Sequence, residues 1–261
     1  MTTRGSYVDL AKSRLDWASA GIDRLEILVD SFLTTKPCEI TSSMKREGED
    51  AHFSYTLHIL NQPPPTISFA VGDVVHNLRA TLDNLVWSIG KVFKTDDDLG
   101  LEFYRSKPTF LKRYVPKICK LPQPIYDWIE SIQPYHGRNY IKLCYVLNIL
   151  WNRDKHRTPP LTVTLADTNT LGYSGEMLPF DTMVFHHPSG RKDQEQIVSA
   201  VVPWERRNDF KPKFTFLIAF NETGVVKRNI LGCPESVIPY LRHIQKYILE
   251  NIIPKFVPYL S

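Results

Sequence analysis

The hydrophobic residues of this chain repeat with two different periods, and this change of period restricts the fold more than any other feature. Between residues 7 and 33, apolar side chains recur every three or four positions, which is typical of one face of an amphipathic helix. Between residues 52 and 59 they occupy every second position, as in a strand with one buried face. A chain with both patterns is expected to fold in the α+β class.

The same two patterns predict the other elements. Helical spacing is found in these segments: 7–33, 73–93, 109–115, 124–132, 141–151 and 234–253. Asp73 is the expected N-cap of the second helix, and Pro254 is expected to end the last one. Strands are expected at 52–59, 66–69 (as the return strand), 161–166, 182–187, 195–202, 213–220 and 224–229.

The order of these elements indicates the domain organisation. Of the 261 residues, 43% are hydrophobic and 23% are charged, which excludes a disordered chain, a collagen and a coiled-coil rod. We expect a single α+β domain over residues 1–261, a helical bundle with long N-terminal and C-terminal helices packed with an antiparallel sheet. The alternative is a separate strand-rich subdomain at 160–230.

The sequence also indicates a compartment. No apolar stretch approaches the roughly 20 residues of a membrane helix, and no apolar run follows Arg4 as it would in a secretory signal. The four cysteines are scattered and form no CxxC pair, so a thiolate zinc site is not expected. We therefore expect a reduced, cytoplasmic protein without a membrane segment.

A first group of polar residues lies on the helix predicted at 73–93. His76, Arg79, Asp83 and Trp87 follow one another at spacings of three and four, so they form a stripe opposite the aliphatic one. Because Trp usually seeks burial, this second face is not expected to be fully hydrated. Such a helix can line a cleft.

A second group, Asn152 to Arg157, directly follows the apolar helix 141–151. It carries Asn152, Lys155, His156 and Arg157. If the two helices pack together, His76 and His156 approach one another among the charged side chains of both segments.

This combination would suit metal-free chemistry on a phosphate-bearing ligand, with RNA as the first candidate. The two histidines would act as general acid and base, with Asp83 orienting an imidazole. Arg79, Lys155 and Arg157 would hold the phosphate, and Asn152 and Trp87 would complete the ligand-binding surface. The 2′-hydroxyl of RNA supplies the nucleophile, and the chain has no dinucleotide-binding, P-loop, zinc-protease or hydrolase motif. No cofactor and no metal are expected.

The alternative is a non-enzymatic interaction or sensor protein. Arg79 and Asp83 would then form an ordinary intrahelical pair or part of a buried inter-helix bridge. The basic residues after the apolar helix would complement the negative end of its dipole. In this interpretation the sheet offers the binding surface.

The segment Gly72–Trp87 together with Asn152–Arg157 resembles a group of uncharacterised bacterial proteins of similar length. In that group a helix with the pattern LRxxLDxLvw precedes an NxDKHR segment, and residues 132–135 fit as well. The resemblance implies a grouping but no mechanism. The helical part is also distantly similar to the HEPN superfamily of helical-bundle ribonucleases. Arg153 and His156 are too close for the HEPN signature, so no HEPN active site is transferred.

Overall fold

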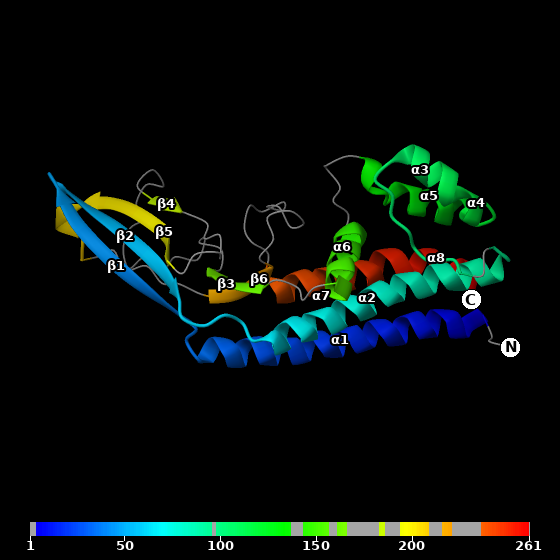
Figure 1. Cartoon of the computed structure of the whole chain (residues 1–261), viewed down its shortest axis with the longest axis horizontal. Coiled ribbons are helices and arrows are strands. Elements are labelled where there is room, and N and C mark those ends of the chain that lie inside the picture. The colour runs from blue at the N-terminus through cyan, green and yellow to red at the C-terminus, as the bar shows by residue number, and fades with distance from the viewer. Residues whose placement is uncertain are drawn as a thin grey trace. The chain divides into compact units, whose positions relative to one another are not determined.

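The computed structural model describes residues 4–95, 98–136, 143–156, 161–165, 183–185, 194–208, 216–220 and 236–260. The fold is α+β: a helical bundle with long N-terminal and C-terminal helices, together with antiparallel β-structure (Figure 1). The chain divides into two compact units. The helical unit contains residues 1–26, 65–159 and 238–261, and the sheet unit contains 27–64 and 160–237. The segment 160–230 lies within the sheet unit.

Eight α-helices lie in the described residues: α1 (Arg4–Thr34), α2 (Pro65–Val92), α3 (Lys107–Arg113), α4 (Val115–Ile118), α5 (Gln123–Ser131), α6 (Leu143–His156), α7 (Val237–Tyr247) and α8 (Ile253–Leu260). A short 3₁₀ helix, η1 (Pro134–His136), follows α5, and a π-helix, η6 (Ile248–Ile252), joins α7 to α8. The helical prediction for 7–33 is confirmed, and α6 extends beyond the predicted 151.

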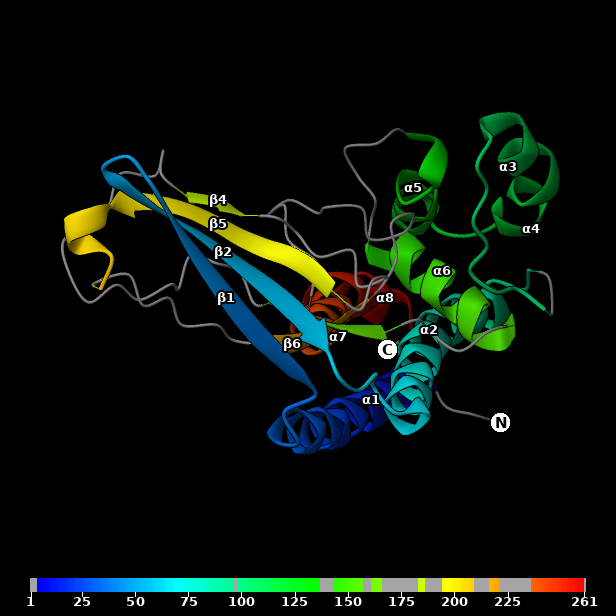
Figure 2. The same cartoon turned by 60° about the vertical axis from the view of Figure 1, so that its left-hand side comes forward.

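Helix α2 is the centre of the helical unit. Fifteen of its residues are buried, including the aliphatic stripe from Val74 to Ile89. It packs against α6 and α8, and it lies beside α1 in two views (Figures 1 and 2). A Cβ atom on Gly21 of α1 would lie only 2.9 Å from Val74 Cγ2, so the two helices approach closely at this glycine. Helix α2 therefore positions its polar side chains among several packed neighbours.

The start of α2 differs from the prediction. The expected strand at 66–69 is wrong, and Asp73 is an interior residue rather than the N-cap, because the helix begins at Pro65. Proline is favoured in the first turn of a helix, where its missing N–H costs no hydrogen bond. Ile67 and Val71 then continue the buried stripe toward the N-terminus, and both are at most 1% exposed.

The C-terminal helix also differs from the prediction. Pro254 does not end it but lies in the first turn of α8. The π-helix accommodates the proline: the N–H of Ile253 donates to the carbonyl of Ile248, five residues back, rather than four. The helical hydrogen-bond pattern is thereby shifted by one residue just before Pro254, which has no N–H to donate.

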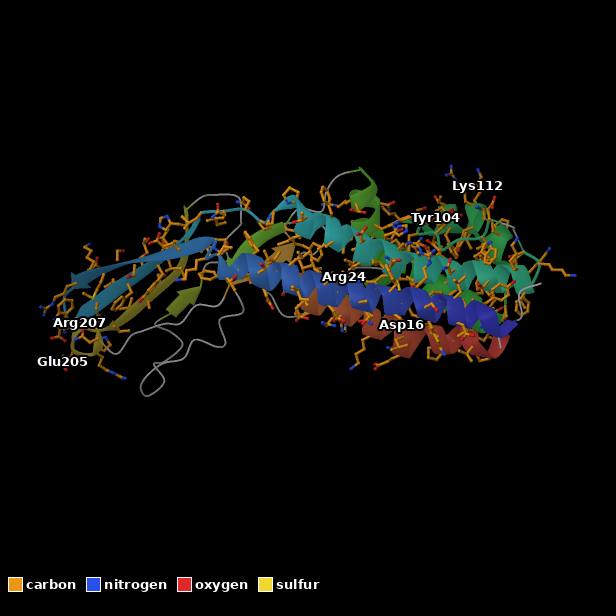
Figure 3. All side chains as sticks on the ribbon, turned by 90° about the horizontal axis from the view of Figure 1, so that it is seen from below. Asp16, Arg24, Tyr104, Lys112, Glu205 and Arg207 are labelled. Carbon is orange, nitrogen blue, oxygen red and sulfur yellow. The ribbon has the colours of Figure 1, made fainter. Side chains whose placement is uncertain are left out.

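The sheet unit contains two antiparallel sheets. The larger has the strand order β1 (Cys38–Glu47), β2 (Asp50–Ile59), β5 (Gln194–Pro203) and β4 (Met183–Phe185), and the smaller pairs β3 (Leu161–Leu165) with β6 (Phe216–Phe220). The strand that forms a hairpin with β2 is thus β1, joined to it through the two-residue loop Gly48–Glu49, where Gly48 has φ +62°. Figure 3 shows Glu205 and Arg207, from the short helix η5 (Trp204–Arg206) and its C-cap, at the hairpin end of this sheet. The strand expected at 224–229 lies outside the described residues.

Candidate functional site

Arg79 is the buried centre of the polar stripe on α2. The residue is only 3% exposed. Its Nη1 donates to Asp83 Oδ1 at 2.6 Å, and its Nη2 donates to the carbonyl of Leu101. The N–H of Leu101 donates at 3.0 Å to the same Asp83 oxygen. The ion pair therefore holds both polar groups of the Leu101 backbone, so it fixes the segment after α2 onto the helix.

Two aromatic rings flank the same guanidinium. Arg79 Cζ lies 5.1 Å from the centroid of the Trp151 ring on α6 and 5.7 Å from that of Phe103. Both distances are within the range of cation–π attraction. We call Arg79, Asp83, Leu101, Phe103 and Trp151 the Arg79 cluster. It joins three parts of the helical unit: α2, the 99–106 segment and α6.

The charges of the Arg79 cluster balance. One guanidinium faces one carboxylate, and the Asp83 side chain is 32% exposed, so the acid keeps part of its hydration. A buried charge is tolerated when a partner and hydrogen bonds compensate for its lost hydration. The Nε atom of Arg79 has no hydrogen-bond partner among the described residues. Each Nη nitrogen donates one bond to the protein, and with the residue only 3% exposed the guanidinium is turned inward rather than toward a surface ligand.

Gln133 holds the same 99–106 segment from its other side. The residue is 1% exposed, and its Oε1 accepts from the N–H of Tyr104 at 2.9 Å. Its Nε2 donates to the carbonyls of Glu102 and Ile129, each at 3.1 Å. A buried amide with three bonds to backbone groups fixes the segment against α5.

Glu102 extends this network toward the surface. Its carboxylate accepts from Lys117 Nζ at 2.8 Å and from the hydroxyl of Tyr104. Burial, followed by the contact with Glu102, raises the pKa of Tyr104 to about 12. A phenol with this pKa stays protonated at neutral pH and remains a hydrogen-bond donor.

Helices α2 and α6 also meet at Gly72 and Asp154. A Cβ atom on Gly72 would lie 2.7 Å from Asp154 Cγ, so only glycine leaves room for this carboxyl group. Burial and the nearby Asp73 raise the pKa of Asp154, whereas His76 lowers it. The packing of the two helices, on which the predicted site depended, is therefore present, and it brings Asp154 into the electrostatic range of His76.

Three other predicted residues lie toward the surface. His76 and Asn152 are exposed. Trp87 is 36% exposed, its ring makes an edge contact with Tyr7 of α1 at 6.0 Å, and Lys91 Nζ lies 5.5 Å from its centroid. Trp87 thus contacts α1 on one side of α2.

The structure describes the other half of the predicted site only in part. Helix α6 runs to His156, so Asn152, Lys155 and His156 belong to one helix. The side chains of Lys155 and His156, and the whole of Arg157, lie outside the described residues. The predicted approach of the two imidazoles stays a prediction.

Sequence reasoning missed several partners of Arg79. Leu101 participates through its backbone, and Phe103 and Trp151 participate through their rings, so none of them forms a polar motif. Gly72 could have been found, because a glycine inside a helical pattern often marks a close approach of another element. The described residues include no group of three or more His, Cys, Asp or Glu side chains placed to hold a metal ion.

Comparison with known proteins adds no relative. No protein-family model matches the chain, and neither the curated proteins nor the solved structures include a match. Within the described part of the chain, every helix is too short or too polar to pass through a bilayer.

Proposed function

We propose that this chain is a non-enzymatic interaction protein in which the Arg79 cluster holds the helical unit together and the sheet unit presents the binding surface. The observation that supports this proposal is the environment of Arg79. Its Nη1 pairs with Asp83, its Nη2 donates to the Leu101 carbonyl, and two aromatic rings flank the guanidinium. An arginine that binds phosphate must instead present its guanidinium to the ligand, whereas Arg79 is buried.

The charges around His76 also favour this function over phosphate binding. Among the described residues, Asp154 interacts electrostatically with both Asp73 and His76. A carboxylate that acts electrostatically on His76 disfavours a phosphate group at this place, since like charges repel. Metal-free cleavage of RNA by His76 and His156 with Asp83 stays a prediction. It is favoured by one observation, the packing of α6 on α2.

The proposal includes a cytoplasmic location. Cys38 is a buried thiol and Cys119 an exposed thiol, which suits a reducing compartment. Burial raises the pKa of Cys38 to about 11, so this thiol stays protonated and unreactive at neutral pH.

The experiment compares activity and stability in the same variants. Wild type, His76→Ala, His156→Ala and Asp83→Asn are incubated with mixed RNA in the presence of a chelator, and each is melted. We expect the four proteins to leave the RNA equally intact, while only Asp83→Asn melts several degrees lower. RNA cleavage by the wild type that both histidine variants lose, with unchanged melting temperatures, would overturn the proposal.

A further inference from the structure

Strand β1 forms one edge of the four-stranded sheet. It precedes β2 in the strand order and has no neighbour on its other side among the described strands (Figures 1 and 2). Residues 41–47 of this strand are all exposed. Ten residues of edge strand carry a row of backbone groups that can pair with a further strand. Long exposed edges of this kind are used for strand addition by a partner.

The hairpin register decides which residues face outward. Glu47 and Asp50 flank the two-residue loop, so they form a hydrogen-bonded pair, and the pairs then alternate along the strands. The N–H of Leu60 donates to the Pro37 carbonyl at 2.8 Å, which agrees with this alternation. The outward backbone groups therefore belong to the even-numbered residues of β1: Cys38, Ile40, Ser42, Met44 and Arg46.

We propose that β1 pairs antiparallel with β1 of a second copy of this chain, with Ser42 opposite Ser42. This inference rests on the proposed function and names the partner of the sheet unit. Ser42 lies on the two-fold axis, and the outward residues of one strand then face those of the other. Five hydrogen-bonded residue pairs, Cys38 with Arg46 at the ends, would supply about ten backbone hydrogen bonds.

The side chains match in this register on both faces of the sheet. Glu39 lies opposite Lys45 of the other copy, and symmetry makes this pair twice. These are non-hydrogen-bonded positions, where side chains approach most closely. On the other face Ile40 lies opposite Met44, a residue that is 48% exposed in the single chain. Both residues lie on the same face as Phe53, Tyr55 and Leu57 of β2, so pairing extends the apolar row across the junction.

Neighbouring registers match less well. If the two-fold axis passed through Ser43 instead of Ser42, Glu39 would lie opposite Glu47 of the other copy. Like charges at opposed positions destabilise a sheet. Moving the axis to Thr41 would set Ile40 opposite Ser42 and Lys45 opposite Pro37, so the cross-copy pair of Lys45 with Glu39 would be lost. Charge and apolar complementarity therefore select the register centred on Ser42.

The first experiment measures the mass of the purified full-length chain by light scattering after size exclusion, over a range of concentrations. We expect twice the mass of one chain at the higher concentrations. Ser42→Pro removes an outward donor without removing a bond to β2, because proline is tolerated in an edge strand when its N–H faces solvent. This variant is expected to be monomeric, with an unchanged melting temperature when wild type and variant are both measured as dilute monomers.

A charge exchange tests the register. Glu39→Lys and Lys45→Glu each place like charges opposite one another, and each is expected to weaken the dimer about tenfold. The double variant restores opposite charges and is expected to regain the wild-type dissociation constant.

A monomeric wild type overturns the inference, and so does a dimer that is insensitive to Ser42→Pro or to the charge exchange. These outcomes concern mass, whereas RNA cleavage and melting of the α2 and α6 variants decide the proposed function. The two failures are therefore distinguishable.

Discussion

The carboxyl group of Asp154 lies directly over Gly72, in the space that a side chain at residue 72 would need. The contact joins the end of α6 to the interior of α2, four residues (about one helical turn) before the exposed His76. It also places an acidic group in a partly dehydrated position beside Asp73. The space at residue 72 and the charge of Asp154 are therefore both features of this contact, and substitutions can test each of them.

The effect of Gly72→Ala on the free energy of unfolding is expected to depend on the residue at position 154. In the wild-type background the added methyl group forces the Asp154 carboxyl aside, and we expect a loss of about 1 kcal/mol in the free energy of unfolding. In an Asp154→Ala background the space is free, and alanine is favoured over glycine inside a helix by about 0.5–1 kcal/mol. Urea unfolding of the four proteins measures this. A loss of equal size in both backgrounds would show that Asp154 does not occupy this space.

The raised pKa of Asp154 predicts a pH-dependent stability. Because the folded-state pKa is above the unfolded value, the ionised carboxylate destabilises the fold at neutral pH, and protonation removes this cost as the pH falls through the folded pKa. Asp154→Asn is therefore expected to be more stable than wild type at pH 7. Urea unfolding should find that this difference shrinks toward about pH 4. A difference that stays constant with pH, or that has the opposite sign, would contradict the assignment.

Gln133→Leu is expected to destabilise the helical unit by about 2–4 kcal/mol. The substitution keeps the size of the side chain but leaves the Tyr104 N–H and two carbonyls without their buried partner. Gln123→Leu is the control, because Gln123 is exposed and, within the described residues, its amide bonds only Asp127. Amide hydrogen exchange should show faster exchange at Tyr104 in the Gln133 variant alone. Unchanged protection at Tyr104 would mean that Gln133 does not hold this segment.

The sequence predicted the elements whose periodicity reflects burial. Helix α1 and the core of α2 follow from the three-and-four spacing, and β2 follows from strict alternation. Strand β1 was missed because residues 41–47 are exposed, so neither face imposes an apolar period on them. The start of α2 was misplaced because the prolines before Thr66 were interpreted only as a break, although Pro65 is itself the first residue of the helix.

The candidate site was predictable to a lesser degree. The stripe on α2 and its meeting with α6 follow from sequence, since both depend on helical spacing and apolar packing. The burial of Arg79 does not, because it depends on a backbone carbonyl at Leu101 and on the ring of Trp151, 72 positions further along the chain. Contacts made by main-chain groups and by distant apolar residues leave no local pattern.

The most direct test of the account is the free energy of unfolding of Arg79→Met, measured in urea beside Lys112→Met. Lys112 is exposed, and Figure 3 shows its side chain extending away from the ribbon. If Arg79 holds α2, the 99–106 segment and α6 together, its loss removes the Nη1 bond to Asp83 and the Nη2 bond to the Leu101 carbonyl. The variant should then be destabilised by about 2–4 kcal/mol, against less than about 0.5 kcal/mol for the control. Equal stability of the two variants would contradict a structural role for Arg79.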